Sequence, residues 1–238
     1  LSRVTKGNGT YTTYLYDSAD QLRVLTNYAP DDRLNSRFEY TYDRRGRRTA
    51  MATVDGDWTY AYDATGQLSH ARFVARNAEV PDQDLEYHYD AVGNRTFTVS
   101  NGLRTDYKVN SLNQYTGVGG LVLDYDLDGN LVSDGTHRYE YDPLKRLVSV
   151  TGPDSVSKYE YDAFGTRRFE IVNGDEQTFL VDPFEWGNVI ARLRDADVHA
   201  RYIHGLGLVR TERDGRAYYC DYDGIGSVVG HSQEGGIT

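Results

Sequence analysis

The chain has 238 residues, with 36 acidic and 26 basic side chains, a net charge of −10 and one cysteine. A single cysteine excludes an internal disulfide framework and a cysteine-based zinc cluster. The acidic balance argues against nucleic acid as a partner, and no apolar run approaches the ~18 residues of a membrane span.

The chain begins at Leu1 and not at a methionine, so we expect it to be part of a larger protein. No signal peptide is recognisable in it. Tyrosine dominates its aromatic residues, with 21 Tyr against 7 Phe and 2 Trp. Tyr-Asp dyads recur along the chain, and degenerate copies fill the wider gaps. This pattern predicts a single array over residues 1–238 of about eleven units of ~20 residues. The intact dyads begin at Tyr16, Tyr42, Tyr62, Tyr89, Tyr125, Tyr141, Tyr161 and Tyr222; degenerate copies lie at Val109-Asn110, Val181-Asp182 and Ile203-His204.

Aromatic residues alternate with other residues ahead of most dyads, as in Tyr40-Thr41-Tyr42 and Tyr159-Glu160-Tyr161. A period of two places both rings on one face of a strand. A turn then follows, with Asp first and Gly fourth, as in Asp43 to Gly46. This fits a type I turn in which the carboxylate accepts backbone N–H groups and the fourth residue takes a positive φ.

Several repeats depart from this turn sequence. Asp and Asn tolerate positive φ, and proline suits the second position, so most departures still fit the turn. Lys145 and Glu185 fit poorly at the fourth position, which predicts bulges or longer loops there. The other variants are Asp20, Asn113 and Gly207 at the fourth position and Pro143 and Pro183 at the second.

A second turn closes each unit with Asn-Gly or Asp-Gly, a strong hairpin signal. The predicted fold is therefore all-β, an antiparallel meander of hairpins that forms one long curled or spiral sheet and buries its tyrosine face. Backbone carbonyls or turn carboxylates would accept the buried hydroxyl groups. The second turns lie at Asn8-Gly9, Asp55-Gly56, Asn101-Gly102, Asp134-Gly135, Asn173-Gly174 and Asp214-Gly215.

The repeated YDxxG unit resembles the YD-repeat, or Rhs, family from about Tyr11 onward, and residues 203–238 resemble the start of the Rhs-associated core. The resemblance implies a β-strip that spirals into a hollow shell, in large secreted or surface-displayed proteins that often enclose a toxin. The family's self-cleaving protease core and a toxin domain are absent from this sequence. Eleven repeats are also few for a closed shell, so the resemblance implies a shell segment.

One stretch, Asp124-Tyr125-Asp126-Leu127-Asp128-Gly129, opens like a calcium loop. An EF-hand would need Glu at the twelfth position, where Gly135 stands, and a helix on each side. The repeat explains Asp126 to Gly129 as an ordinary turn. Calcium binding by Asp124, Asp126 and Asp128 is left open, and no metal, cofactor or catalytic residue is assigned.

Other residues that carry chemistry have structural interpretations that we prefer. The basic run Arg44 to Arg48 straddles a turn and is expected to be solvated. The six histidines show no metal-ligand spacing, and Ser227 does not stand in a nucleophile elbow. We expect Cys220 to be a buried, inert thiol. Carboxylates are required at every turn, so their abundance says nothing about catalysis.

The leading hypothesis is a non-catalytic shell wall whose partner is the rest of a parent chain or an enclosed toxin. One alternative is a carbohydrate-binding module that uses Trp58, Trp186 or the inserted loops at 29–35 and 76–84. Another is self-assembly with a second copy through exposed sheet edges.

Overall fold

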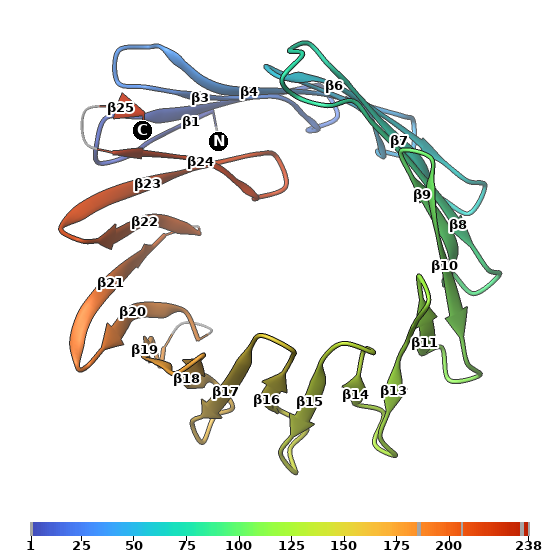
Figure 1. The fold of residues 1–238 in the computed structure, drawn as a ribbon. Coiled ribbons are helices and arrows are strands. Elements are labelled where there is room, and N and C mark those ends of the chain that lie inside the picture. Colours follow the sequence, from blue (N-terminus) through green and yellow to red (C-terminus); the bar gives the residue numbers. More distant parts are fainter. Residues whose placement is uncertain (1, 185–186, 206, 234–235, 238) are drawn as a thin grey trace. The chain divides into compact units, whose positions relative to one another are not determined.

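The structure, a computed structural model, describes residues 2–184, 187–205, 207–233 and 236–237. These residues form antiparallel strands without any helix, and within each of two sheets every strand pairs with its neighbours in the sequence (Figure 1). The prediction of an all-β meander is confirmed. The described part of the chain contains no helix long and apolar enough to cross a membrane.

Within the described residues the strands form two sheets, both in chain order. The first sheet contains β1 (Arg3–Thr5), β2 (Tyr11–Tyr16), β3 (Leu22–Tyr28), β4 (Leu34–Tyr42), β5 (Arg48–Thr53), β6 (Gly56–Tyr62), β7 (Leu68–Ala75), β8 (Gln83–Tyr89), β9 (Arg95–Ser100), β10 (Leu103–Val109), β11 (Tyr115–Val118) and β12 (Leu121–Val122). The second sheet contains β13 (Asp124–Tyr125), β14 (Leu131–Ser133), β15 (Arg138–Tyr141), β16 (Leu147–Thr151), β17 (Val156–Tyr161), β18 (Arg167–Val172), β19 (Asp175–Val181), β20 (Val189–Arg194), β21 (Asp197–His204), β22 (Leu208–Arg213), β23 (Arg216–Tyr222), β24 (Val228–Gln233) and β25 (Gly236–Ile237).

The chain divides into two compact units that do not coincide with the two sheets. Residues 1–105 and 216–238 form the first unit, and residues 106–215 form the second. The first unit therefore brings together the beginning and the end of the chain.

The turn after each dyad has the predicted geometry. In the turn that begins at Asp43, the Asp43 N–H donates to Arg47 O at 2.9 Å and the Gly46 N–H donates to Asp43 O at 3.0 Å. Asp43 Oδ1 accepts the N–H groups of Arg45 and Arg47, and Gly46 has a φ of 76°. A register shift at the dyad tyrosine accompanies the turn, here between Thr41 and Tyr42. The carboxylate thus holds the turn closed from inside.

Lys145 does not cause the bulge or longer loop that its sequence predicts, since the register shift between Glu140 and Tyr141 also occurs at other dyads. Its turn has the same hydrogen bonds as the others, and Lys145 itself adopts a φ of 61°. Pro143 supplies a favourable φ at the second position, and Asp142 Oδ1 accepts two backbone N–H groups, which explains how a lysine is held there. Glu185 lies outside the described residues. The turn near Gly207 differs from the prediction, because the Gly205 N–H donates to Gly207 O.

The second turns are less uniform than predicted. Asn101-Gly102, Asn173-Gly174 and Asp214-Gly215 have positive φ at both central residues, as a type I′ turn requires. Asp195-Ala196 makes the same turn without glycine. In contrast, Asn8-Gly9 belongs to a four-residue turn, in which the Lys6 N–H donates to Thr10 O and the Gly9 N–H donates to Lys6 O.

A ladder of six tyrosine hydroxyl groups links repeats to the ones before them. The Tyr161 hydroxyl donates to Leu147 O at 2.7 Å, and Leu147 is the fifth residue after the preceding turn aspartate, Asp142. Backbone carbonyl groups are therefore the main acceptors of the tyrosine hydroxyl groups, which was one of the two predicted alternatives. The equivalent bonds are Tyr42 to Leu22, Tyr62 to Arg48, Tyr89 to Leu68, Tyr125 to Tyr115 and Tyr141 to Leu131.

The tyrosine face is buried to a smaller extent than predicted. Most dyad rings are only half-buried, and Tyr16 is exposed. The described residues show one well-buried apolar cluster, in which Leu25, Phe38 and Tyr40 pack together. This cluster lies in β3 and β4, within the unit that also contains the end of the chain.

Candidate functional site

A polar seam joins the hairpin of β23 and β24, which we call the last hairpin, to the first strands. Its contacts connect residues 184 to 225 positions apart in the sequence. In Figure 1, β23 and β24 lie beside β1 and β3. We define the seam by its contact residues, which are Lys6, Asn8, Asn27, Asn35 and Tyr40 on one side and Asp221, Tyr222, Gly224, Ser232 and Gln233 on the other.

An ion pair lies at the centre of the seam. The Lys6 ammonium contacts the Asp221 carboxylate, and their side chains are only 7% and 4% exposed. Asn35 Nδ2 donates to Asp221 Oδ2 at 3.1 Å. Because removing one partner of a buried pair leaves an uncompensated charge, loss of Lys6 or Asp221 is expected to cost about 3–5 kcal/mol.

Neutral hydrogen bonds extend the seam on both sides of the ion pair. Asn27, which is fully buried, donates from Nδ2 to Tyr222 O at 3.0 Å and accepts from Thr12 Oγ1 at 2.7 Å. Asn8 Nδ2 donates to Ser232 Oγ at 3.2 Å and to Gln233 O at 3.1 Å. Asn27 is fully buried, whereas Asn8 is partly buried. Asn35 Oδ1 is a buried atom of the seam that has no hydrogen-bond partner among the described residues.

The ring of Tyr40 connects the seam to the apolar cluster. The Gly224 N–H donates to the Tyr40 hydroxyl at 2.8 Å, and a Cβ at Gly224 would lie 2.7 Å from the same oxygen. Glycine therefore permits the close approach of this turn to the ring. Burial raises the pKa of Tyr40, although the Gly224 N–H partly offsets this effect.

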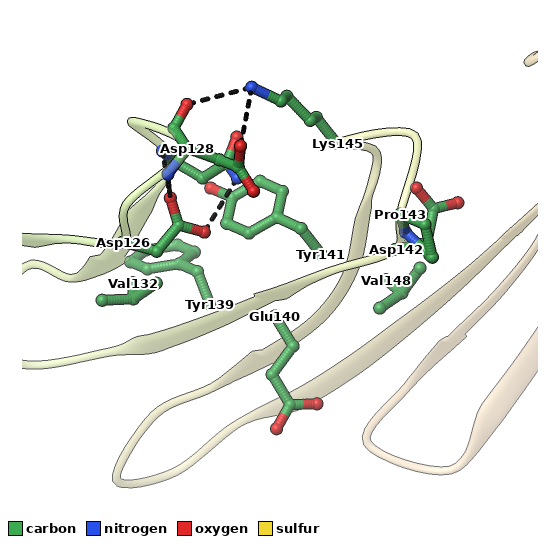
Figure 2. Close-up of a pocket in the computed structure, with 11 residues that line it drawn as sticks. Asp126, Asp128, Val132, Tyr139, Glu140, Tyr141, Asp142, Pro143, Lys145 and Val148 are labelled. Atoms are coloured by element: carbon green, nitrogen blue, oxygen red, sulfur yellow. Dashed lines mark hydrogen bonds and ion pairs between the residues drawn. The ribbon is translucent and has the colours of Figure 1, made fainter.

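The calcium-like sequence lies beside an open groove of about 620 Å³ (Figure 2). The Asp126 carboxylate accepts hydrogen bonds from the backbone N–H groups of Asp128 and Asn130 and from Asn130 Nδ2. The bond from the Asn130 side chain is the main cause of the lowered pKa of Asp126. Lys145 Nζ lies 3.4 Å from Asp128 Oδ1 and donates to Asp128 O at 3.1 Å. Glu140 points away from Asp128 to the other side of the strand (Figure 2).

The carboxylates of Asp126 and Asp128 are thus committed to the turn and to Lys145. Within the described ranges, no group of three or more His, Cys, Asp or Glu side chains could hold a metal ion. Asp124 is exposed and pairs through its backbone with Ser133. The structure does not bring Asp124, Asp126 and Asp128 together as a ligand set.

The basic run Arg44 to Arg48 divides between solvent and the sheet. Arg44 and Arg45 are exposed, as expected. Arg47 bonds to the Asp43 carboxylate at 2.7 Å and stacks 4.5 Å from the ring centroid of Tyr62 in the next repeat. Arg146 makes the same pair of contacts with Asp142 and Tyr161, so these arginines reinforce the repeat contacts.

Three of the histidines and Ser227 have structural partners, and Cys220 is buried. His70 pairs with Asp84 at 2.6 Å, and His88 stacks on Phe97 with centroids 3.9 Å apart. The register shift between Ile203 and His204 places His204 at the dyad-tyrosine position, where the sequence had predicted Ile203. His204 Nε2 lies 2.9 Å from Val189 O there. The Ser227 N–H donates to Asp223 Oδ1. Cys220 is buried, and burial raises the pKa of its thiol, which makes it a poor nucleophile.

Of the residues proposed for carbohydrate binding, Trp58 is used for packing, whereas the inserted loop at 76–84 is mostly exposed. Trp58 is half-buried, with ring centroids 5.1 Å from Phe73 and 6.1 Å from Tyr60. Trp186 lies outside the described residues. The inserted loop at 29–35 forms a four-residue turn that begins at Ala29, and its Asn35 contributes to the seam.

Two features were missed by the sequence analysis. Asn27 and Leu25 alternate onto the same buried face of β3, so an asparagine at an apolar slot was an available signal for the seam. The second feature is a row of exposed apolar side chains at the turn tips; Phe164 and Phe184 are each 93% exposed. The other members of this turn row are Val92, Leu112, Leu127, Leu144 and Ile225.

The repeat geometry defines a YD-repeat β-shell protein: a meander of hairpins with Asp-closed turns and an inter-repeat tyrosine ladder. Residues 57–181 match the model of the Teneurin YD-shell family. Since this match covers more than half of the chain, the chain belongs to that family.

Curated relatives include tRNA3(Ser)-specific nuclease WapA of Bacillus spizizenii, which is 31% identical over 65% of this chain, and tRNA nuclease WapA of Bacillus subtilis, which is 29% identical over the same share. The aligned part is 7% of each of these relatives.

Solved structures share the fold over 99% of this chain. The Photorhabdus luminescens Tc holotoxin pore matches with a TM-score of 0.76 at 17% identity, and the TcdB2-TccC3 complex with 0.75 at 18%. The match covers 14% and 15% of those chains.

Proposed function

We propose that this chain is a non-catalytic wall segment of a hollow β-shell in a longer toxin-like protein that acts outside the cell that makes it. The observation that carries this proposal is that the repeated polar groups form structural hydrogen bonds. The turn carboxylates accept backbone N–H groups of their own turns, and the dyad hydroxyl groups donate to carbonyl groups of the previous repeat, so both kinds of group stabilise the sheet. The similarity to Tc toxin structures and to WapA supports the toxin context.

The turn row supports contact with other parts of a longer chain. Several apolar side chains are largely exposed along consecutive turns of the second unit, including Leu144, Phe164 and Phe184. Exposed apolar patches of this kind mark protein–protein contact surfaces. Residues 203–238, which resemble the start of the Rhs-associated core, would lead from this segment into the next part of the parent chain.

Electron microscopy of the longer protein that contains this chain tests the proposal. We expect a hollow particle with this chain in its wall. A particle in which the chain forms a separate lobe, away from any hollow, would refute the proposed wall function.

Catalysis is tested on the chain itself. The unaltered chain and a variant with Asp126→Asn and Asp142→Asn should be equally inactive towards tRNA and glycans. Turnover by the unaltered chain that the variant loses would contradict a non-catalytic role.

A further inference from the structure

The position before each dyad tyrosine distinguishes the last hairpin from the rest of the array. This position lies on the face opposite the dyad ring, and it is exposed in the ten preceding units; its occupants there are Leu15, Thr41, Ala61, His88, Lys108, Asp124, Glu140, Glu160, Leu180 and Ile203. In the last hairpin the same position holds Asp221, which is 3% exposed. Only there, among the described repeats, is this face covered by other strands of the chain.

Apolar packing alone does not fix where the last hairpin docks. The repeats present similar rings at similar positions, so a hairpin displaced by two strands, about 10 Å, would meet a similar surface. The polar groups do differ between neighbouring positions. The turn that begins at Lys6 and the turn that begins at Ala29 have the same hydrogen bonds, so Ala29 holds the place of Lys6.

A displaced hairpin would therefore separate a buried charge from its partner. Asp221 would lie opposite Ala29, and Lys6 would be left without a carboxylate. The displacement would also separate Asn27 from Tyr222 O and Asn8 from Ser232 and Gln233 O. Buried polar groups penalise every arrangement in which they are unpaired, and such groups are known to select register in other folds.

We propose that the buried pair of Lys6 and Asp221, with the asparagines beside it, sets the docking register of the last hairpin on the first two. The pair selects one position among several that the repeated tyrosine face would otherwise permit. This inference does not depend on the shell function, because it concerns only how the array contacts itself.

Cysteine cross-linking measures the register directly. Ser232 Oγ lies 3.5 Å from Thr10 Oγ1, so Thr10→Cys with Ser232→Cys reports the observed register. Arg33 holds the place of Thr10 in the next turn, so Arg33→Cys with Ser232→Cys reports the displaced register. Both probes are made in a Cys220→Ala background, and disulfide yields are compared after mild oxidation.

The parent sequence should favour the Thr10 link over the Arg33 link by at least about tenfold. Asp221→Asn should reduce that ratio by at least about tenfold, whereas Lys6→Asp combined with Asp221→Lys should restore it. Glu39→Gln, which removes the carboxylate of the exposed pair with Arg37, is the matched control and should leave the ratio unchanged.

A second variant separates register from stability. Lys6→Met combined with Asp221→Leu replaces the buried pair with apolar side chains, a change that commonly preserves folding. We expect this variant to fold and to lose the preference for the Thr10 link. A preference kept at the parent value in this variant, or in Asp221→Asn, would overturn the proposal.

Discussion

The tyrosine ladder gives a sharp test of what holds neighbouring repeats together. Tyr161→Phe removes one hydroxyl group, which donates to Leu147 O at 2.7 Å. A hydrogen bond of this kind contributes about 1 kcal/mol net. The carbonyl lies in a half-buried region that water reaches after the change, so we expect a loss of about 1 kcal/mol and no more.

Tyr159→Phe is the matched control, because Tyr159 lies two residues away on the same half-buried face and its hydroxyl makes no hydrogen bond with the described residues. Urea unfolding followed by circular dichroism measures the free energy of unfolding of both variants, and hydrogen exchange of β16 and β17 localises the change. Equal losses in the two variants would refute the ladder as a source of stability.

The sum over the ladder shows why this test is informative. The described residues contain six dyad bonds of this kind, so their total contribution is on the order of 6 kcal/mol if distant sites add. That total is comparable to the ~5–15 kcal/mol stability of an ordinary domain. Phe substituted at all six dyads should therefore lower the free energy of unfolding by about 6 kcal/mol, which unfolds an array at the lower end of that range.

Four further outcomes are expected. Gly165 has a φ of 84°, which strains any residue with a Cβ even though no neighbouring atom occupies the space. Gly165→Ala should therefore lower the free energy of unfolding in urea by about 1 kcal/mol, and Gly165→Asn should lower it less. Burial raises the pKa of Tyr60 to about 12, and the hydrogen bond to Asp134 raises the pKa of Tyr139 to about 12. The stability that these two groups contribute is therefore complete below pH 10.0 and falls as the pH rises towards 12. A free energy of unfolding that stays constant between these two pH values would contradict this. The hydrogen bond from the Tyr139 hydroxyl lowers the pKa of Asp134, so the stability that Asp134 contributes is present above pH 3.8 and is lost on acidification. Asp134→Asn should therefore make the acid-induced loss of the dichroism signal less steep. Calcium should leave the melting temperature unchanged. If calcium raises it, and raises it further in Lys145→Gln, which frees the Asp128 carboxylate, the calcium-like sequence would have to be a cation site after all.

The local structure was predictable because every repeat carries its own sequence signals for the strand and the turn. Asp at the first turn position and Gly at the fourth occur often enough to define the turn, and the alternation before each dyad defines the strand. Lys145 was misjudged because its sequence violates the glycine preference, whereas the Asp142 carboxylate and Pro143 hold the backbone in place.

The seam was not predictable from periodicity. Lys6 and Asp221 are 215 residues apart, and neither residue type is unusual at its position when only one repeat is considered. The extent of ring burial was also overestimated, because alternation shows which face carries the rings and not what covers that face. Only the three-dimensional structure shows that the last hairpin covers the face containing Tyr40.

The wide sequence separation across the seam has a consequence for the order of folding. Hairpin contacts join residues that are close in the chain, so they form without a large loss of chain entropy. The contact between Tyr40 and Gly224 spans 184 residues and must wait until nearly the whole array has been synthesised. During synthesis the early hairpins therefore spend their first seconds without the cover that the last hairpin gives to the ring of Tyr40, and this interval is when the nascent chain most needs protection from aggregation.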